Sequence, residues 1–336
     1  MNRLVSFLKL IRLPNLIIIG LAQYAMRYGV IYPMYLFINK QLILNFPNKI
    51  TNPSIIELQV SNLHFFCLCL STLLIAAGGY IINDYFDINI DRINKPQQLI
   101  IDNGIKRRSA MALHLALNLI ALLLAGIVLF KMGFLKYILI YIACSFGLWY
   151  YTTEFKKAFL IGNIIIAIFV AMVPFTVGLF ELQLAASKYA VLTNPPFYVN
   201  FKKIFHFILG FSALSFLINF IREIIKDIED IDGDLAYGCE TLPITLGFEI
   251  TKNILITLIG FMIAIMGFIQ RGQWDAGAFL SFWYILLLIQ LPLLLVGYLI
   301  WTGKNPSKFK WPDLITKGIM LTGIAYVIVI YLGFTN

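Results

Sequence analysis

Long apolar runs recur along the whole chain of 336 residues, and they constrain its fold more than any other feature. A run of about 20 apolar residues is long enough to cross the hydrocarbon core of a bilayer as one helix. The sequence therefore predicts spanning helices at residues 13–36, 62–83, 111–130, 134–152, 160–180, 204–222, 252–270, 278–301 and 314–334. The expected fold is an all-α bundle of about nine transmembrane helices, forming a single domain over residues 1–336.

Composition and charge agree with a membrane location. Hydrophobic residues make up 60% of the chain and charged residues 13%, with a mean hydropathy of +0.85, whereas soluble domains carry about 25% charged residues. With the N-terminus inside, 17 of the 26 Lys and Arg residues lie on the inner side, as is usual for cytoplasmic loops. We expect an integral protein of the cytoplasmic membrane with a cytoplasmic N-terminus. The net charge of +9 mostly reflects this bias, and the sequence offers no soluble basic domain for nucleic acid.

Two acidic clusters stand at the ends of predicted spans, at residues 83–91 (NDYFDINID) and 223–234 (EIIKDIEDIDGD). They follow the second and sixth spans, so both are expected at the cytoplasmic surface. The order of span, acidic run, basic loop and span occurs over residues 62–130 and again over 204–270, which is a weak internal repeat. We expect the two halves to face each other across one cavity. Carboxylates next to lipid are costly and usually mark function.

The spacing within each cluster places most of its acids on one helix face, since an α-helix turns by about 100° per residue. The first face holds Asn83, Asp84, Asp87 and Asp91. If the second helix continues through Gly233, its face holds Asn219, Glu223, Lys226, Asp227, Asp230 and Asp234. Glu229 and Asp232 are then expected to point elsewhere.

Facing carboxylates repel one another unless a cation lies between them. Oxygen ligands without Cys or His favour a hard ion, Mg²⁺ or Ca²⁺. Mg²⁺ typically takes one or two carboxylates and completes its shell with substrate phosphate oxygens. Two such half-sites could hold a diphosphate between them, with further positive charge from Arg92, Lys95, Arg107, Arg108, Arg222 and Lys226. A diphosphate at the membrane surface with an apolar tail in the bundle describes a polyprenyl diphosphate.

The pattern Asn83-Asp84-x-x-Asp87-x-x-x-Asp91 resembles the first aspartate motif of the UbiA superfamily of intramembrane prenyltransferases, and the cluster at 223–234 resembles its partner motif. The resemblance covers the whole chain, including the positions of the motifs after the second and sixth helices. Further matching residues are Lys95-Pro96, Gly104, Tyr150-Tyr151, Lys156-Lys157, Gly162-Asn163, Thr241-Leu242-Pro243 and Gly247. Gln97-Gln98 depart from the pattern of many relatives, which leaves the contacts of that loop open.

The resemblance implies a site that binds Mg²⁺ and a prenyl diphosphate. The implied metal ligands are Asp84, Asp87, Asp91, Asp227, Asp230 and Asp234, and the implied catalytic residues are Asp84, Asp87, Asp230 and Lys156. The expected substrate contacts are Asn83, Arg92, Lys95, Lys157, Arg222, Glu223, Lys226 and Tyr150. Spacing does not decide between Lys156 and Lys157, or between Arg92 and Lys95. The implied reaction ionises the prenyl diphosphate to an allylic cation, which a lipophilic acceptor then captures.

The sequence leaves the acceptor open. The second motif is most similar to the subgroup that transfers a geranylgeranyl group to geranylgeranylglycerol phosphate, which implies O-prenylation of a glycerol-phosphate lipid. An aromatic acceptor, as in quinone biosynthesis, is the alternative. A cation transporter is the alternative of another class, because repeated halves and intramembrane carboxylates are also signatures of transporters. Its acids are expected near the middle of the membrane, whereas here they stand at helix ends with basic neighbours.

Overall fold

The computed structural model describes residues 3–46, 55–94, 97, 99–102, 104–194, 197 and 199–335. Within these ranges the chain is helical and forms no β-strand, in agreement with the predicted all-α class. The longer elements are α1 (Arg3–Leu10), α2 (Leu13–Tyr24), η1 (Ala25–Ile31), α3 (Tyr32–Asn45), α4 (Asn62–Asn94), α5 (Arg107–Lys131), α6 (Ile138–Thr153), α7 (Ile161–Lys188), α8 (Phe201–Glu229), α11 (Phe248–Asp275), α12 (Phe279–Ile285), η6 (Leu286–Gln290), α13 (Leu291–Thr302) and α14 (Lys310–Thr335). The short ones are η3 (Leu135–Tyr137), η4 (Phe155–Lys157), η5 (Ala190–Thr193), α9 (Ile231–Ala236), α10 (Leu242–Thr245) and η7 (Pro306–Phe309).

Seven of the described helices are long and apolar enough to cross a membrane, or eight if α1 and the segment Leu13–Asn45 form one span with a 55° bend. The chain is thus an integral membrane protein. All nine predicted segments lie largely within helices, but the count of nine is not confirmed. The helix α6 has 16 residues, which is short for a span of about 20.

Two of the spanning segments contain a wide π-helical turn just before a proline. The turn η1 precedes Pro33, and η6 precedes Pro292. A proline has no backbone N–H and its ring clashes with the carbonyl one turn earlier, so the helix widens locally instead of breaking. The segment from α2 to α3 therefore continues as one helix across the bundle.

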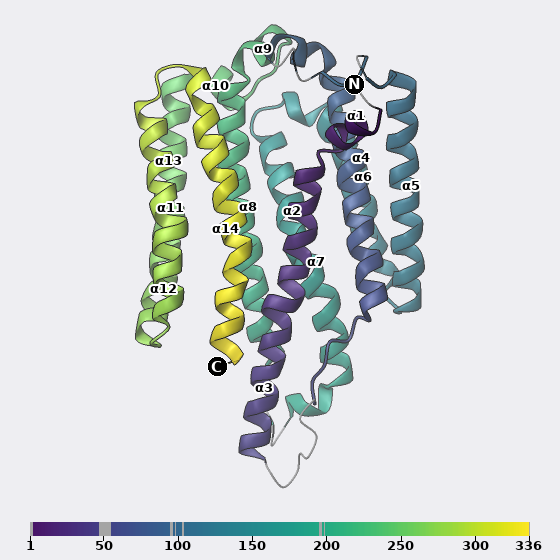
Figure 1. Ribbon diagram of the computed structural model, residues 1–336, viewed down its shortest axis with the longest axis vertical. Coiled ribbons are helices and arrows are strands. Elements are labelled where there is room, and N and C mark those ends of the chain that lie inside the picture. The colour runs from purple at the N-terminus through teal and green to yellow at the C-terminus, as the bar shows by residue number, and fades with distance from the viewer. Residues whose placement is uncertain are drawn as a thin grey trace.

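The spanning helices stand roughly side by side around a central space, and the connections α9 and α10 lie at the same end as the N-terminus (Figure 1). The helix α4 packs against α5 and α6, and α7 packs against α8. The first spanning segment contacts α4 and α7, and also α14. The first and last spans of the chain are therefore neighbours in the bundle.

Small and polar residues bring α4, α5 and α6 close together. A Cβ atom on Gly78 would lie 2.5 Å from the side chain of Asn118, so only glycine allows this approach of α4 to α5. Asn118 also accepts a hydrogen bond of 2.6 Å from Ser145 on α6. Such small residues and interhelical hydrogen bonds are typical of helix packing in lipid, and here they fix the helix that carries the first acidic cluster.

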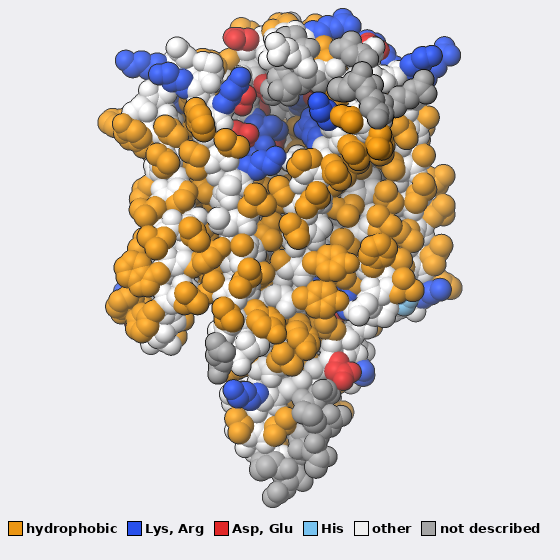
Figure 2. Space-filling view, viewed as in Figure 1, with side chains coloured by type: hydrophobic (Ala, Val, Ile, Leu, Met, Phe, Trp, Pro, Cys, Tyr) orange, Lys and Arg blue, Asp and Glu red, His pale blue; other side chains and the backbone are white. Residues whose placement is uncertain are grey.

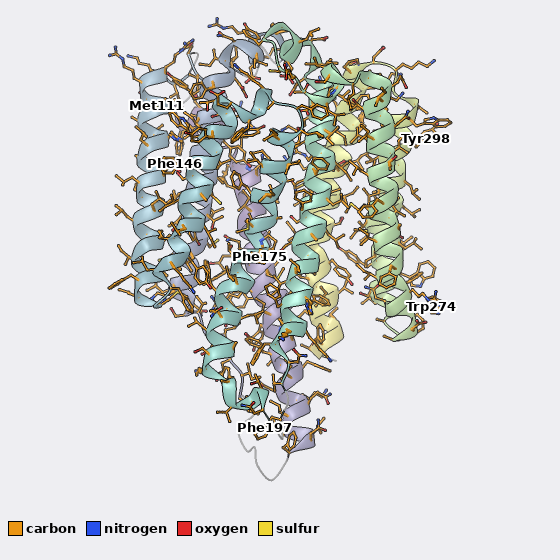
Figure 3. All side chains as sticks on the ribbon, turned by 180° about the vertical axis from the view of Figure 1, so that it is seen from behind. Met111, Phe146, Phe175, Phe197, Trp274 and Tyr298 are labelled. Carbon is orange, nitrogen blue, oxygen red and sulfur yellow. The ribbon has the colours of Figure 1, made fainter. Side chains whose placement is uncertain are left out.

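The outward faces of the bundle are apolar. Phe146 on α6 is 61% exposed and Tyr298 on α13 is 57% exposed, and both project away from the bundle (Figure 3). Trp274 projects at the end of α11 far from the N-terminus (Figure 3). Exposed apolar surface of this extent is expected where lipid replaces water as the solvent. The polar residues that carry chemistry must therefore lie inside the bundle or at its ends.

Candidate active site

One large cavity opens inside the bundle, with a volume of about 2170 Å³. Figure 2 shows blue and red side chains gathered in a hollow near one end of the molecule, above a broad belt of hydrophobic side chains. The cavity continues from this polar end to residues 276–281, between α11 and α12, and to Phe334 at the end of α14. Small-molecule sites usually measure about 300–1,000 Å³, so this cavity has room for two elongated ligands.

Both acidic clusters line the polar end of this cavity, as the sequence predicts. The lining residues from α4 are Asn83, Asp84, Asp87 and Asp91, and those from α8 and its continuation are Arg222, Glu223, Lys226, Asp227, Asp230 and Asp234. Side chains from two helices far apart in the sequence thus face one space. The metal-ligand roles that the resemblance implies for these acids stay predictions.

A direct link joins the ends of the two clusters. Asn94, the last residue of α4, donates a hydrogen bond of 3.0 Å to the carbonyl oxygen of Asp230 and accepts one of 2.8 Å from the N–H of Gly233. A Cβ atom on Gly233 would lie 2.4 Å from the Asn94 side chain. Glycine at 233 therefore permits the close contact that sets the spacing between the clusters.

In the first cluster, basic side chains from other parts of the chain pair with the carboxylates. Asp84 contacts Arg12, which lies in the bend between α1 and α2, at 2.7 Å. Asp87 is buried, forms an ion pair with Lys156 of η4, and accepts a 2.6 Å hydrogen bond from Asn83. Burial alone would lower the pKa of Lys156, but the charge and hydrogen bond of Asp87, together with Tyr151 and Asp234, hold the pKa of Lys156 above its ordinary value. Lys156 is consequently charged at neutral pH.

In the second cluster, polar partners again hold the carboxylates in place. Asp227 accepts a hydrogen bond of 2.7 Å from Asn163 on α7. Glu223 lies 3.0 Å from Lys226 and 3.7 Å from Arg222. Fixed orientation of this kind is what a metal or phosphate site requires of its ligands.

Three of the predicted substrate contacts do not line the cavity. Arg92 is exposed and lies 3.9 Å from Asp102, Lys157 is exposed, and Tyr150 is 54% exposed; none of them lines the cavity. Lys156 and Tyr151, the sequence neighbours of Lys157 and Tyr150, line the cavity instead. Lys95 lies outside the described residues. Arg107 and Arg108 are also absent from the cavity wall, and Arg107 pairs with Asp102 at 2.7 Å.

The assumption of one continuous helix through Gly233 is wrong. The helix α8 ends at Glu229, and α9 begins at Ile231. Glu229, the last residue of α8, lines the cavity although its helical phase predicts otherwise. Asp232 is exposed and lies outside the cavity, as expected.

Several residues at the site could not be recognised as a group from the sequence. The sequence marked Arg12 only as one of several basic residues. It marked Asn163 only as part of the matching pair Gly162-Asn163. The lining residues Asn15, Asn94, Asp313 and Lys317 carried no signal as site residues, because no local motif marks them. Asn15 joins the site through the packing of α2 against α4, and Asp313 and Lys317 join it through the packing of α14 against α8. Asn94 is the last residue of α4 itself.

The donor atoms at the polar end fit Mg²⁺. Within the described ranges, no three His, Cys, Asp or Glu side chains gather closely enough to hold a metal ion by themselves. Mg²⁺ does not require such a group, because it commonly takes one or two carboxylates and fills its shell with water and substrate phosphate. Asp84 and Asp227 each present carboxylate oxygens to the cavity from opposite helices. Asp84 at the first cluster and Asp227 at the second would each supply oxygen ligands of the kind that Mg²⁺ takes.

Fold and site together define a helical integral membrane protein with a carboxylate-lined cavity open to a long apolar interior. The sequence pattern of the UbiA prenyltransferase family matches residues 55–317. The chain belongs to this family, which confirms the resemblance drawn from its motifs.

Among curated proteins, the chain is 35% identical over 189 residues to the digeranylgeranylglyceryl phosphate synthase of Sulfurisphaera tokodaii, covering 55% of this chain and 60% of that protein. A solved digeranylgeranylglyceryl phosphate synthase is 23% identical, with a TM-score of 0.57 over 98% of this chain and 99% of its own. A UbiA homolog from Archaeoglobus fulgidus bound to DMAPP and Mg²⁺ is 15% identical, with a TM-score of 0.55 over 96% and 99% of the two chains. The solved structures share the fold with this chain.

The contact between Asn94 and Gly233 yields a testable expectation. In a Gly233→Ala variant the added Cβ atom must push the Asn94 side chain away and so shift the two clusters relative to each other. A misplacement of about 1 Å at a catalytic site can cost about a hundredfold in rate, so we expect prenyl transfer to fall by about tenfold to a hundredfold. Steady-state turnover in detergent measures this.

Gly260→Ala is the matched control, because a Cβ atom there meets open space on an exposed face of α11. Equal activity of both alanine variants would show that the Asn94 contact does not set the spacing of the clusters.

Proposed function

We propose that the protein is an Mg²⁺-dependent prenyltransferase that moves a prenyl group from a prenyl diphosphate to the hydroxyl of a glycerol-phosphate lipid. The observation that carries the proposal is the pairing of two carboxylate clusters on facing helices with one cavity that is polar at one end and apolar below. The names of the relatives and the ligands of the solved neighbour support it.

The residues of this chain have distinct tasks in the proposed reaction. Bound Mg²⁺ supplies the charge that stabilises the departing diphosphate. Lys156, charged and held by Asp87, adds a donor for phosphate oxygens at the same end. Asn163 orients Asp227. The apolar walls below exclude water, so that the prenyl cation meets the acceptor before it meets water.

The proposed transfer balances as a simple substitution. The C–O bond between the prenyl carbon and the diphosphate breaks, and the diphosphate leaves with the bonding electrons. The acceptor hydroxyl oxygen forms a new ether bond to that carbon, and its proton passes to the released diphosphate. No oxidant or reductant is needed.

The distribution of charge supports an orientation with the acidic clusters at the cytoplasmic surface. Lys and Arg are concentrated in the connections at that end of the predicted topology. We propose that the protein lies in the cytoplasmic membrane and takes water-soluble Mg²⁺ and the diphosphate head from the cytoplasm. A transporter is disfavoured, because the carboxylates lie at the end of the cavity among basic residues and the chain belongs to the prenyltransferase family.

The proposal is tested by incubating membranes that contain the protein with labelled prenyl diphosphates of several lengths. The acceptors are a glycerol phosphate monoether, 4-hydroxybenzoate and a naphthoate, each offered separately. We expect a labelled product with the glycerol phosphate, its loss to background on chelation with EDTA, and its return when Mg²⁺ is restored. Absence of Mg²⁺-dependent product with every acceptor would contradict the enzyme assignment, and product only with an aromatic acceptor would contradict the acceptor class.

A further inference from the structure

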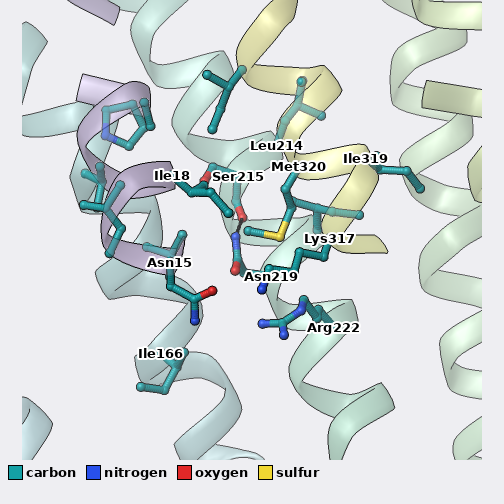
Figure 4. A pocket seen from close by; sticks show the side chains of 18 of the residues that line it. Asn15, Ile18, Ile166, Leu214, Ser215, Asn219, Arg222, Lys317, Ile319 and Met320 are labelled. Atoms are coloured by element: carbon teal, nitrogen blue, oxygen red, sulfur yellow. Dashed lines mark hydrogen bonds between the residues drawn. The ribbon is translucent and has the colours of Figure 1, made fainter. Parts of the chain in front are cut away.

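A lysine on the last helix points into the cavity and is not explained by the site described so far. Lys317 on α14 lines the cavity and is half-buried. Figure 4 shows its side chain directed toward Arg222 and Asn219 of α8. Within the described part of the chain, Lys317 makes no hydrogen bond and no ion pair of 4 Å or less. A lysine that only served the interface would extend toward the lipid headgroups, whereas this one extends inward.

The charges around Lys317 do not cancel. Arg222 lies 2.9 Å from Asp313 and 3.7 Å from Glu223, and Glu223 also pairs with Lys226 at 3.0 Å. Asp227 also interacts with Glu223 and Lys226, so these groups belong to one charge network with the second cluster. Asp313 attracts Lys317, but Arg222, Arg12 and Lys226 repel it. Lys317 thus has one attracting carboxylate and three repelling cations around it, and a charged group in such surroundings is costly unless an anion compensates it.

Lys317 and Arg222 lie on a different wall of the cavity from Lys156, one of the two basic residues that pair with the first cluster. Lys156 belongs to η4 and pairs with Asp87 of α4, whereas Lys317 and Arg222 belong to α14 and α8. Asn15, Ser215 and Asn219 lie around the same space and offer hydrogen-bonding groups (Figure 4). Ile18, Leu214 and Met320 surround it with apolar side chains (Figure 4). The local chemistry suits an anionic head that carries a hydrocarbon chain.

We infer that Lys317 and Arg222 form the binding site for the phosphate of the acceptor lipid. The inference rests on the proposed function and assigns its second substrate to a place in the cavity. The guanidinium of Arg222 can bind two phosphate oxygens at once, and the Lys317 ammonium adds a point charge. The phosphate held there anchors the acceptor on the α8 and α14 side, while its glycerol hydroxyl reaches the prenyl carbon beside the acidic clusters.

The test compares Lys317→Met with wild type in purified full-length protein. Methionine keeps the length and apolar stem of lysine but removes its charge. Loss of one charge-assisted hydrogen bond usually corresponds to about tenfold to a hundredfold in affinity, so KM for a glycerol phosphate monoether is expected to rise by at least about tenfold. KM for the prenyl diphosphate is expected to change less than about twofold, because Lys317 lies on the other wall. Lys317→Arg is expected to restore most of the acceptor affinity.

Two controls separate charge recognition from structural damage. Lys310→Met removes an exposed lysine of the same helix that does not line the cavity, and its kinetics are expected to match wild type. A glycerol monoether without phosphate is expected to bind equally weakly to wild type and to Lys317→Met. Mg²⁺-dependent binding of a non-hydrolysable prenyl thiolodiphosphate shows that Lys317→Met is folded.

The outcomes distinguish this inference from the proposed function. An unchanged acceptor KM in Lys317→Met, with normal turnover in wild type, overturns the inference and leaves the transferase assignment intact. The inference is also overturned if 4-hydroxybenzoate is the better acceptor and its KM rises in Lys317→Met as much as that of the glycerol phosphate. Lys317 and Arg222 would then recognise a carboxylate instead of a lipid phosphate. If wild type transfers no prenyl group to any acceptor, the proposed function itself fails.

Discussion

Asp84→Ala and Asp230→Ala variants are each expected to transfer prenyl groups at least about a hundredfold more slowly than wild type. The two side chains line the cavity from opposite clusters, and removing one element that stabilises charge in a transition state typically costs about a hundredfold to a thousandfold. The rates are measured with saturating Mg²⁺ and both substrates, so that weaker binding does not mask the loss in the chemical step.

Asp232→Ala is the matched control for this pair, since Asp232 belongs to the same acidic run but is exposed and lies outside the cavity. It is expected to keep nearly full activity. Near-normal turnover in both Asp84→Ala and Asp230→Ala would remove the two carboxylates from the proposed site. A loss in Asp232→Ala as large as theirs would show that the break after Glu229 does not separate these side chains functionally.

Lys156→Met is expected to lower the transfer rate by at least about a hundredfold, the second large effect. The variant removes the cation that pairs with buried Asp87. Of the two donors to Asp87 described above, only the amide of Asn83 is then left. It also removes the donor that we propose for the diphosphate. The expected signature is a fall in kcat together with weaker binding of the prenyl diphosphate, measured by turnover and by equilibrium binding of a thiolodiphosphate analogue.

Lys157→Met provides the comparison, because Lys157 is the next residue but is exposed and does not line the cavity. Its activity is expected to stay within about threefold of wild type, as for most exposed substitutions. The reverse ranking of the two variants would mean that the η4 turn presents Lys157 to the diphosphate.

The spans could be predicted from the sequence because the bilayer imposes a single requirement on each of them, a long apolar run. The all-α class and the membership of the UbiA family are confirmed. The number of spans could not be fixed, because α6 is too short to meet the same requirement and depends on its neighbours. Helical phase served well for α4, which runs unbroken from Asn62 to Asn94.

Phase was less reliable for the second cluster, where α8 ends at Glu229. The contact of Gly233 with Asn94 involves residues far apart in the sequence, so no local pattern could reveal the break. The basic residues of the site could not be identified from the sequence for the same reason. Motif spacing could not choose between Lys156 and Lys157, because a short turn decides which of the two faces the cavity. Lys317 belongs to no motif at all and reaches the site through the docking of α14.

The position of α14 bears on how the protein is made. Because α14 follows every other described helix in the sequence and packs against both α8 and the first spanning segment, this wall of the cavity closes only after α14 has been synthesised. A nascent chain interrupted before Lys310 already carries both acidic clusters but lacks Asp313 and Lys317. The charged groups of its cavity are then exposed on the side that α14 covers. Insertion of α14 is thus the step at which the charged end of the cavity becomes enclosed by protein.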